Sequence, residues 1–340
     1  MGIYDYILCS GSGNRFLMFD TLRSDLSGLN IAAFSAQELS RFRVDGLLLL
    51  TRDAQGRFGM RMFNTDGSEA EMCGNGIRCI ARLACDRYPE AAGGRFVVTS
   101  GGREYRITRE EPIFGALPTF GVEIPLSQHS GDFAPSLGAE DFTGRAITEL
   151  DEELRFTFLA PGNPHIVAKV AADSPWLFGG ESRLDTARLS ALGERANRMR
   201  EIFPKGINVS LFCRLDESRI FVATYERGVG ITSSCGTAMT SCATATALLG
   251  DSHFDAPIDV WNRGGRVRCL PRRTAQGLVT RLTGNASFEK TGTIRLDEKG
   301  RITADDALPL DPPGNERRLA EQTIRELNEK YGLTITETHD

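Results

Sequence analysis

Two short stretches decide the fold of this chain: Glu71–Ile80, EMCGNGIRCI, and Ser234–Thr240, SCGTAMT. Each places a Cys-Gly pair directly before a run of small and apolar residues. These runs predict two helices, from Asn75 to about Asp86 and from Thr237 to about Leu249. The second run, TAMTSCATATALL, is small and apolar on all sides, which is typical of a buried helix.

Short alternating or apolar runs surround both helices. Turn sequences such as DAQG, TDGS and SGGR separate the runs, as expected for antiparallel strands. In the first third the runs lie at Tyr4–Cys9, Phe16–Asp20, Gly46–Thr51, Phe58–Phe63, Arg95–Thr99 and Glu104–Thr108, with one helix among them. Later they lie at His165–Val170, Ile207–Cys213, Arg219–Tyr225, Ile258–Trp261, Arg266–Leu270 and Leu278–Leu282. The pattern predicts an α+β fold in which a sheet with a central helix occurs twice.

This duplication predicts three regions: a first half over 1–124, a second half over 125–280, and returning strands with a charged tail over 281–340. A polar insertion around Ser127–Glu153 and an amphipathic helix near Asp185–Glu201 belong to the second half. The tail, beyond about Asp297, contains LPLDPPGNE and a predicted helix, Glu316–Lys330. Its charge predicts a surface appendage that takes no part in the chemistry.

The composition excludes several classes of protein. The 340 residues carry a formal net charge of −5, whereas a nucleic-acid-binding surface needs a clustered basic excess. No apolar run approaches the roughly 18 residues of a membrane span, and the N-terminus lacks the pattern of a secretory signal. The eight cysteines include no Cys-x-x-Cys pair, which favours reduced thiols in a cytoplasmic protein over disulfides or structural zinc.

A cysteine at a helix start occupies a reactive position. The helix N-terminus carries partial positive charge, which stabilises a thiolate, and its free N–H groups can hold a carboxylate. Two such helices, headed by Cys73 and Cys235, could present one sulfur to each face of a carbon atom and so invert it by proton transfer. The alternative is two buried thiols with incidental glycines. We favour the functional interpretation because a Cys-Gly pair stands at a helix start twice in the chain.

The sequence supports no cofactor and no metal. None of the five lysines lies in a glycine-rich phosphate cradle, so a pyridoxal Schiff base is unsupported. The segment GSGNRF at 11–16 lacks the spacing of a dinucleotide-binding loop. The four histidines are too scattered for a metal cluster. His165, which follows Asn163-Pro164, is a candidate for orienting a site group, although a core or surface role is about as frequent.

In its cysteine motifs the chain resembles the diaminopimelate epimerase family. The segment MRMFNTDGSEAEMCGNGIRCIAR is similar to the family's first cysteine motif, and YERGVGITSSCGTA is similar to its second. SGSGNRFLMFD, PGNPH and FPKGINV match in the same order, so the resemblance runs from about residue 5 to 285. It implies two pseudo-symmetric α+β halves, each a curled, mostly antiparallel sheet around a central helix, with the active site in the cleft between them.

The resemblance also implies a role for individual residues. Cys73 and Cys235 would be the acid–base pair of a cofactor-independent epimerase that interconverts LL- and meso-diaminopimelate. The amides of Gly74, Asn75, Gly236 and Thr237 would hold the carboxylate at the reacting centre. The rest of this small-molecule substrate would contact Asn14, Asn64, Asn163, Asn208, Glu226 and Arg227. A homodimer is left open.

Four departures from the family pattern concern the pocket wall. Arg15 stands where the family usually has Asp, and RFRVDG at 41–46 replaces a turn of the His-x-Gly-Ile-Gly-Ala-Asp type. Ile231 replaces an acidic residue, and Thr237-Ala238 replaces Ser-Gly. Two alternatives therefore stay open: a related racemase of another amino acid, such as histidine, and a non-catalytic amino-acid-binding protein.

Overall fold

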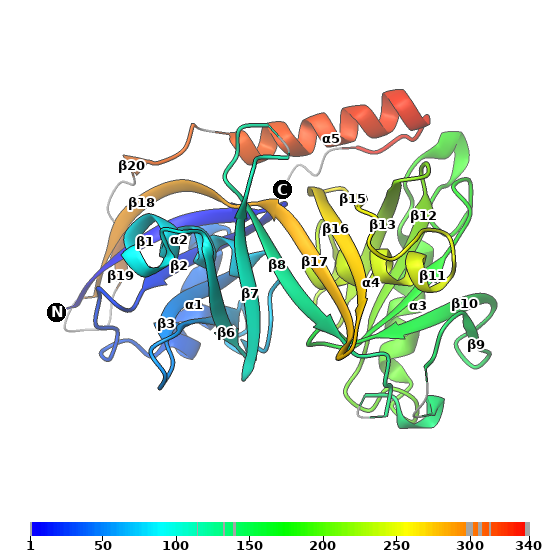
Figure 1. Ribbon diagram of the computed structural model, residues 1–340, viewed down its shortest axis with the longest axis horizontal. Coiled ribbons are helices and arrows are strands. Elements are labelled where there is room, and N and C mark those ends of the chain that lie inside the picture. Colours follow the sequence, from blue (N-terminus) through cyan, green and yellow to red (C-terminus); the bar gives the residue numbers. More distant parts are fainter. Residues whose placement is uncertain are drawn as a thin grey trace. The chain divides into compact units, whose positions relative to one another are not determined.

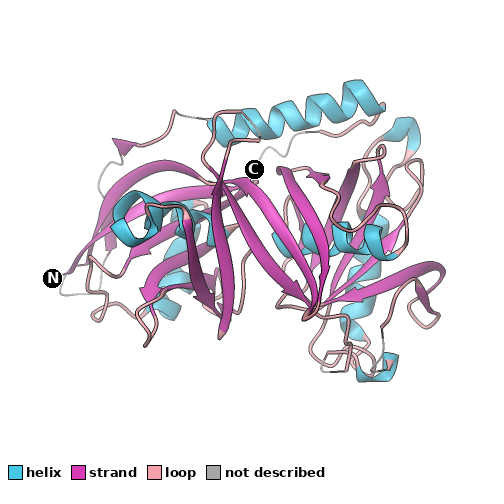
Figure 2. Ribbon diagram, in the orientation of Figure 1, coloured by secondary structure: helices cyan, strands magenta, loops and turns pink. Residues whose placement is uncertain are grey.

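The computed structural model describes residues 2–113, 115–131, 133–138, 141–296, 302–304, 308–312 and 314–336. Strands dominate and helices are few (Figure 2), so the expected mixed α+β class is confirmed. The chain divides into two compact units. Unit 1 contains Met1–Val122 and Thr283–Leu319, and unit 2 contains Glu123–Leu282 and Ala320–Asp340.

Unit 1 pairs the first strand of the chain with a late one (Figure 1). Its elements are β1 (Gly2–Gly11), β2 (Asn14–Asp20), α1 (Ile31–Phe42), β3 (Gly46–Arg52), β4 (Phe58–Asn64), β5 (Glu69–Ala70), α2 (Gly76–Arg87), β6 (Arg95–Ser100), β7 (Arg103–Glu110), the start of β8 (Thr119–Leu126), β18 (Ser287–Leu296), β19 (Ile302–Ala304) and β20 (Leu308–Pro309). Strand β1 is antiparallel to β2 and β18. Strands β2 and β3 are parallel, β3 and β4 antiparallel, β4 is antiparallel to β5 and parallel to β6, and β6 is antiparallel to β7.

Unit 2 repeats this order of pairing. Its elements are β9 (Arg145–Ile147), β10 (Asp151–Leu159), β11 (His165–Lys169), α3 (Ala187–Arg198), β12 (Asn208–Arg214), β13 (Arg219–Glu226), β14 (Gly230–Thr232), α4 (Gly236–Leu248), β15 (Ile258–Asn262), β16 (Gly265–Thr274), most of β17 (Gly277–Asn285) and most of α5 (Asn315–Tyr331). Strands β10 and β11 are antiparallel, β11 and β12 parallel, and β12 and β13 antiparallel. Strand β13 is then antiparallel to β14 and parallel to β15, which is antiparallel to β16.

The two cysteine-headed helices are the most buried helices of their units. Helix α2 packs against β1, β3 and β4, and α4 packs against β11, β12, β13, β15 and β16. In α4 every residue from Gly236 to Ala247 is buried. The hydroxyls of Thr240, Thr244 and Thr246 donate to carbonyls four residues earlier, at 2.8 Å, so these buried polar groups are satisfied inside the helix.

One expectation about secondary structure was wrong. The first third contains a second helix, α1, which begins after Asn30, whose side chain accepts from the Ala33 amide at 3.1 Å. The described strand pairs are mostly antiparallel, as expected, but β2–β3, β4–β6, β11–β12 and β13–β15 are parallel. Parallel neighbours need a long crossover, and α1, α2, α3 and α4 supply it.

The C-terminal helix is not a surface appendage, contrary to expectation. Helix α5 buries Leu319, Thr323, Ile324 and Leu327, and the last two belong to the hydrophobic core of unit 2. The charged composition conceals this apolar stripe. Parts of the tail, including Asp297 and its neighbours to residue 301, lie outside the described residues. Among the described residues, no helix has the length and apolar character needed to cross a membrane.

Candidate active site

Cys73 caps α2 through both its backbone and its side chain. Its carbonyl accepts from the Ile77 amide at 3.0 Å, the first helical hydrogen bond, and its Sγ accepts from the Gly76 amide at 3.3 Å. A Cβ atom at Gly76 would lie 2.8 Å from Leu48 Cδ2, so glycine is the residue that fits this position. Of the eight cysteines, all in the described part of the chain, Cys73 alone is half-buried and the rest are buried.

Cys235 holds the same position on α4. Its carbonyl accepts from the Met239 amide at 3.0 Å, and its Sγ accepts from the amide of Ala238 and lies 3.4 Å from Thr237 Oγ1. Burial and then the charge of Glu226 nevertheless raise the pKa of this thiol well above its ordinary value. The expectation of a stabilised thiolate is therefore wrong for Cys235, because burial outweighs the hydrogen bonds of the helix start.

In unit 1 the structure brings Asn14 and Asn75 together. The buried Asn75 donates from Nδ2 to Asn14 Oδ1 at 2.6 Å, and Asn14 donates to Asp45 Oδ2 at 3.2 Å. Gly74 lies beside Asn75 in the same turn. Asn64 ends β4, and its side chain donates to Ser68 Oγ at 3.0 Å across the following turn. Its hydrogen bonds belong to that turn and do not join those of Asn14.

In unit 2 His165 links three of the predicted residues. Parallel pairing of β11 with β12 sets His165 opposite Asn208, and the His165 Nε2 lies 3.3 Å from Asn208 Nδ2. The same nitrogen lies 3.1 Å from both Asn163 Oδ1 and Thr237 Oγ1. Burial and the Arg227 charge lower the pKa of His165 to about 3, so the ring is neutral near pH 7. Its Nδ1 has no hydrogen-bond partner among the described residues.

Glu226 and Arg227 lie where β13 turns into β14. Glu226 accepts from Thr232 Oγ1 at 2.7 Å and its carboxylate is close enough to Cys235 to hydrogen-bond the thiol. The Arg227 amide donates to Asn208 Oδ1 at 2.9 Å, and its guanidinium donates to the Lys205 carbonyl at 3.0 Å. The Arg227 side chain is exposed, so it does not require a ligand to balance a desolvated charge.

Sequence reasoning missed the partners that hold these residues. Asp45, inside the unusual 41–46 turn, accepts from the Arg15 amide at 2.8 Å as well as from Asn14. The Arg15 guanidinium binds both carboxylate oxygens of Glu289, at 2.9 and 2.7 Å. The position of Glu289, 274 residues from Arg15, left no local signal of the pairing.

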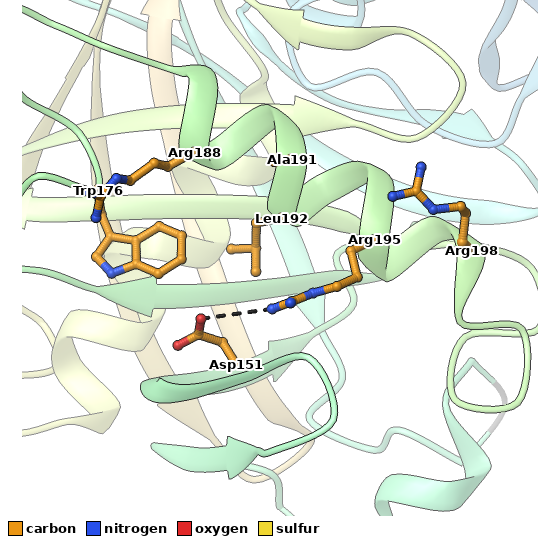
Figure 3. A pocket seen from close by; sticks show the side chains of 7 residues that line it. All are labelled: Asp151, Trp176, Arg188, Ala191, Leu192, Arg195 and Arg198. Atoms are coloured by element: carbon orange, nitrogen blue, oxygen red, sulfur yellow. Dashed lines mark ion pairs between the residues drawn. The ribbon is translucent and has the colours of Figure 1, made fainter.

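A surface cavity of about 470 Å³ lies on α3, and no predicted site residue lines it (Figure 3). Its walls are Asp151, Trp176, Arg188, Ala191, Leu192, Arg195 and Arg198. Arg195 reaches toward Asp151, with 3.8 Å between the charged atoms. Since the two cysteines and the polar clusters lie elsewhere, this cavity is separate from the candidate site.

Residues 6–114 and 160–289 match the sequence model of diaminopimelate epimerase. The chain belongs to the diaminopimelate epimerase family. It is 32% identical over 298 residues to a diaminopimelate epimerase of Listeria monocytogenes, with 86% of each chain covered. Family membership makes the protein an isomerase, an epimerase that works without pyridoxal phosphate.

Solved structures share the fold at low sequence identity. A phenazine biosynthesis protein of the PhzF family from Bacillus anthracis superposes with a TM-score of 0.59 at 14% identity, over 87% of this chain and all of that one. A hydroxyproline epimerase from Agrobacterium vitis, with bound trans-4-hydroxy-L-proline, has a TM-score of 0.57 at 12% identity, over 88% of this chain and 94% of that one. These similarities establish the fold alone.

Proposed function

We propose that the protein interconverts LL- and meso-diaminopimelate, a step of lysine and cell-wall precursor synthesis, by a two-base mechanism that uses Cys73 and Cys235. The observation that carries the proposal is the shared capping geometry. Each cysteine carbonyl accepts the first hydrogen bond of its helix, and each Sγ accepts from the backbone amide three residues later. Family membership supplies the reaction class to which this geometry is applied.

The two sulfurs enter the reaction in different protonation states. Cys235 starts as the neutral thiol because its pKa is raised by burial and Glu226. Cys73, half-buried with an amide donating to its Sγ, starts as the thiolate base. In this direction the Cys73 thiolate removes the α-proton from one face while Cys235 donates its proton to the other face. The products are the inverted centre, a Cys73 thiol and a Cys235 thiolate, and the reverse reaction exchanges the two roles.

Helix-start amides lower the barrier to removing the α-proton. As that proton leaves, negative charge moves onto the adjacent carboxylate, where the amides of Gly74, Asn75, Gly236 and Thr237 would receive it. Backbone N–H groups at two helix N-termini stabilise such developing charge without needing to reorient. His165 would stay a neutral hydrogen-bonding group that orients Thr237, Asn163 and Asn208.

The polar clusters suit a substrate that is charged at its far end. Arg227 presents an exposed planar guanidinium that can bind a distal carboxylate in a bidentate manner. The side chains of Asn14, Asn64, Asn163 and Asn208 offer neutral donors and acceptors. Glu226 supplies a carboxylate that can accept from an ammonium group. Diaminopimelate carries both kinds of group at its distal centre.

A related racemase of another amino acid is the alternative, and Ile231 is the observation that favours it. Ile231 packs against the hydrophobic core of unit 2 at a position where the family usually has an acidic residue. An apolar side chain there could suit a substrate with fewer charged groups. A pure amino-acid-binding protein would need neither thiol.

One assay separates these functions. The protein is incubated in deuterium oxide with LL-diaminopimelate and, separately, with single-centre amino acids including histidine, and the products are resolved by chiral chromatography and mass spectrometry. We expect meso-diaminopimelate labelled at the α-carbon to form fastest. Faster labelling of another amino acid would establish the racemase, and the absence of labelling with every amino acid would contradict the epimerase. The reduced cysteines favour the cytoplasm as the working compartment; the homodimer stays a prediction.

A further inference from the structure

Arg78 is the most tightly enclosed charged side chain of unit 1. It follows Cys73 by five residues, on the first turn of α2, and is fully buried. Its Nη1 donates to the Gly74 carbonyl at 2.8 Å, its Nη2 to Ser12 Oγ at 2.8 Å and its Nε to the Asn285 carbonyl at 3.0 Å. These three acceptors are neutral. A negative charge near a buried guanidinium offsets part of its desolvation.

Glu316 supplies a negative charge at this place. It lies in the first turn of α5, within unit 1; the residue is half-buried and its Oε2 is shielded from solvent. The carboxyl accepts from Asn285 Nδ2, the residue whose carbonyl binds Arg78. The pKa of Glu316 is raised, because burial outweighs the lowering effects of the Ser287 hydroxyl, the Arg78 charge and the Ser10 hydroxyl. The carboxylate of Glu289, also near, is bound by Arg15.

The contact with Gly74 bears directly on the candidate site. In a trans peptide the carbonyl and the following N–H point in opposite directions. Arg78 therefore fixes the direction of the Asn75 N–H when it binds the Gly74 carbonyl. The same hydrogen bond fixes the turn that leads from Cys73 to the Gly76 amide, which donates to the Cys73 Sγ.

We propose that Glu316, from the C-terminal segment beyond the family-matched residues, is a positioning residue for Cys73 that acts through Arg78. The carboxylate balances Arg78, Arg78 holds the Gly74 carbonyl, and the turn then presents an amide to the Cys73 sulfur. The inference rests on the proposed role of Cys73 for its effect on catalysis. Its structural part, the state of the Cys73 thiol, can be measured without any substrate.

The test measures alkylation of Cys73 by iodoacetamide as a function of pH, with the modified peptide quantified by mass spectrometry on the full-length protein. Glu316→Gln keeps the size and the acceptor for Asn285 but removes the charge. We expect it to raise the midpoint of the Cys73 profile by about half a pH unit or more, because the Gly76 amide no longer faces the sulfur. Glu329→Gln, at an exposed position of the same helix, should leave the midpoint unchanged. An unchanged or lowered midpoint in Glu316→Gln would overturn the proposal.

A second pair of variants tests the route through Arg78. Arg78→Met should raise the Cys73 midpoint, and adding Glu316→Gln to it should produce no further shift, since the two residues act in series. The double variant leaves no unpaired buried charge, so it stays usable even if Glu316→Gln alone does not fold. A further shift in the double variant would show that Glu316 acts by another route and would overturn the proposal.

Turnover is measured separately. If the wild-type protein epimerises diaminopimelate, Glu316→Gln should lower kcat by roughly tenfold while KM changes less, because a displaced thiol mainly affects the transition state. A wild-type protein without this activity would contradict the proposed function, while the alkylation profiles would still decide the role of Glu316.

Discussion

Helices α2 and α4 use one capping device in two environments. In both, the cysteine carbonyl accepts the first hydrogen bond of the helix and the Sγ accepts from the amide three residues later. Cys73 is half-buried, whereas Cys235 is buried beside a carboxylate. The backbone thus sets where a sulfur lies, and the surroundings set whether it holds a proton. The proposed two-base mechanism needs one thiol deprotonated while the other is not, and the raised pKa of Cys235 would favour Cys235 as the protonated one.

The largest expected effect removes either sulfur. Cys73→Ala and Cys235→Ala should each lower epimerisation by about 10³-fold or more, since neither sulfur can supply the proton transfer of the other. Chiral chromatography of the product measures this loss. Cys242→Ala, which removes another buried thiol of α4, is the matched control and should keep most of the activity. Substantial turnover by either single-cysteine variant would contradict the two-base scheme.

The second effect concerns the neutral histidine of unit 2. The pKa of folded His165 is about 3, below its ordinary value of 6.5, so the unfolded chain binds an extra proton between these values. Stability from this group is therefore complete above pH 6.5 and is lost as the pH falls toward 3. We expect roughly 3 kcal/mol of lost unfolding free energy by about pH 4. Urea denaturation at several pH values measures it.

His165→Gln should flatten this pH dependence, because glutamine binds no proton. The exposed His253→Gln is the control and should keep the wild-type slope. Equal slopes for wild type and His165→Gln would show that the ring is not held neutral by the fold.

The third effect exploits a residue difference between the two caps. The amide that faces Cys73 belongs to Gly76, but the one that faces Cys235 belongs to Ala238. Gly76→Ala would press on the buried Leu48 side chain and should cost about 1 kcal/mol and lower kcat by roughly tenfold. Ala238→Gly should cost about 1 kcal/mol through helix propensity with a smaller effect on kcat. Thermal unfolding and steady-state kinetics compare the two variants. Equal losses of kcat would show that the amides facing Cys73 and Cys235 contribute equally to turnover.

The smallest expected effect is a change in the pKa of the Cys235 thiol. Glu226→Gln removes the charge that, after burial, raises the pKa of Cys235, so the pH midpoint for alkylation of Cys235 should fall. The measurement uses the Cys73→Ala background, so that Cys235 alone is followed by mass spectrometry. Glu217→Gln, exposed and in the same unit, should leave the midpoint in place. A midpoint that does not move would assign the raised pKa to burial alone.

Local sequence signals predicted the two central helices well. Helices α2 and α4 begin and end within one residue of the expected limits, because Cys-Gly and the small apolar runs are local features. The same rules could have found α1, whose Asn30 cap precedes an apolar pattern at Ile31, Phe34 and Leu39. That helix was missed because the surrounding strands dominated the pattern.

What the sequence could not provide depends on contacts distant along the chain. The raised pKa of Cys235 needs burial and Glu226, which a rule about helix ends does not contain. The pairing of Arg15 with Glu289 and the placement of Glu316 near Arg78 each join residues more than two hundred positions apart. Such pairs become visible only when the helices and strands have packed together.

The pairing of β1 with β18 has a consequence for the order of folding during synthesis. Tyr4 lies opposite Ile294, so β1 meets β18, one of its two neighbours, only after Glu123–Leu282 has been made. Until then that side of β1 exposes unpaired N–H and C=O groups, which can pair with another chain. Contacts of such long sequence separation are slow to form. We therefore expect nascent unit 1 to be open to pairing with other chains until β18 has been made.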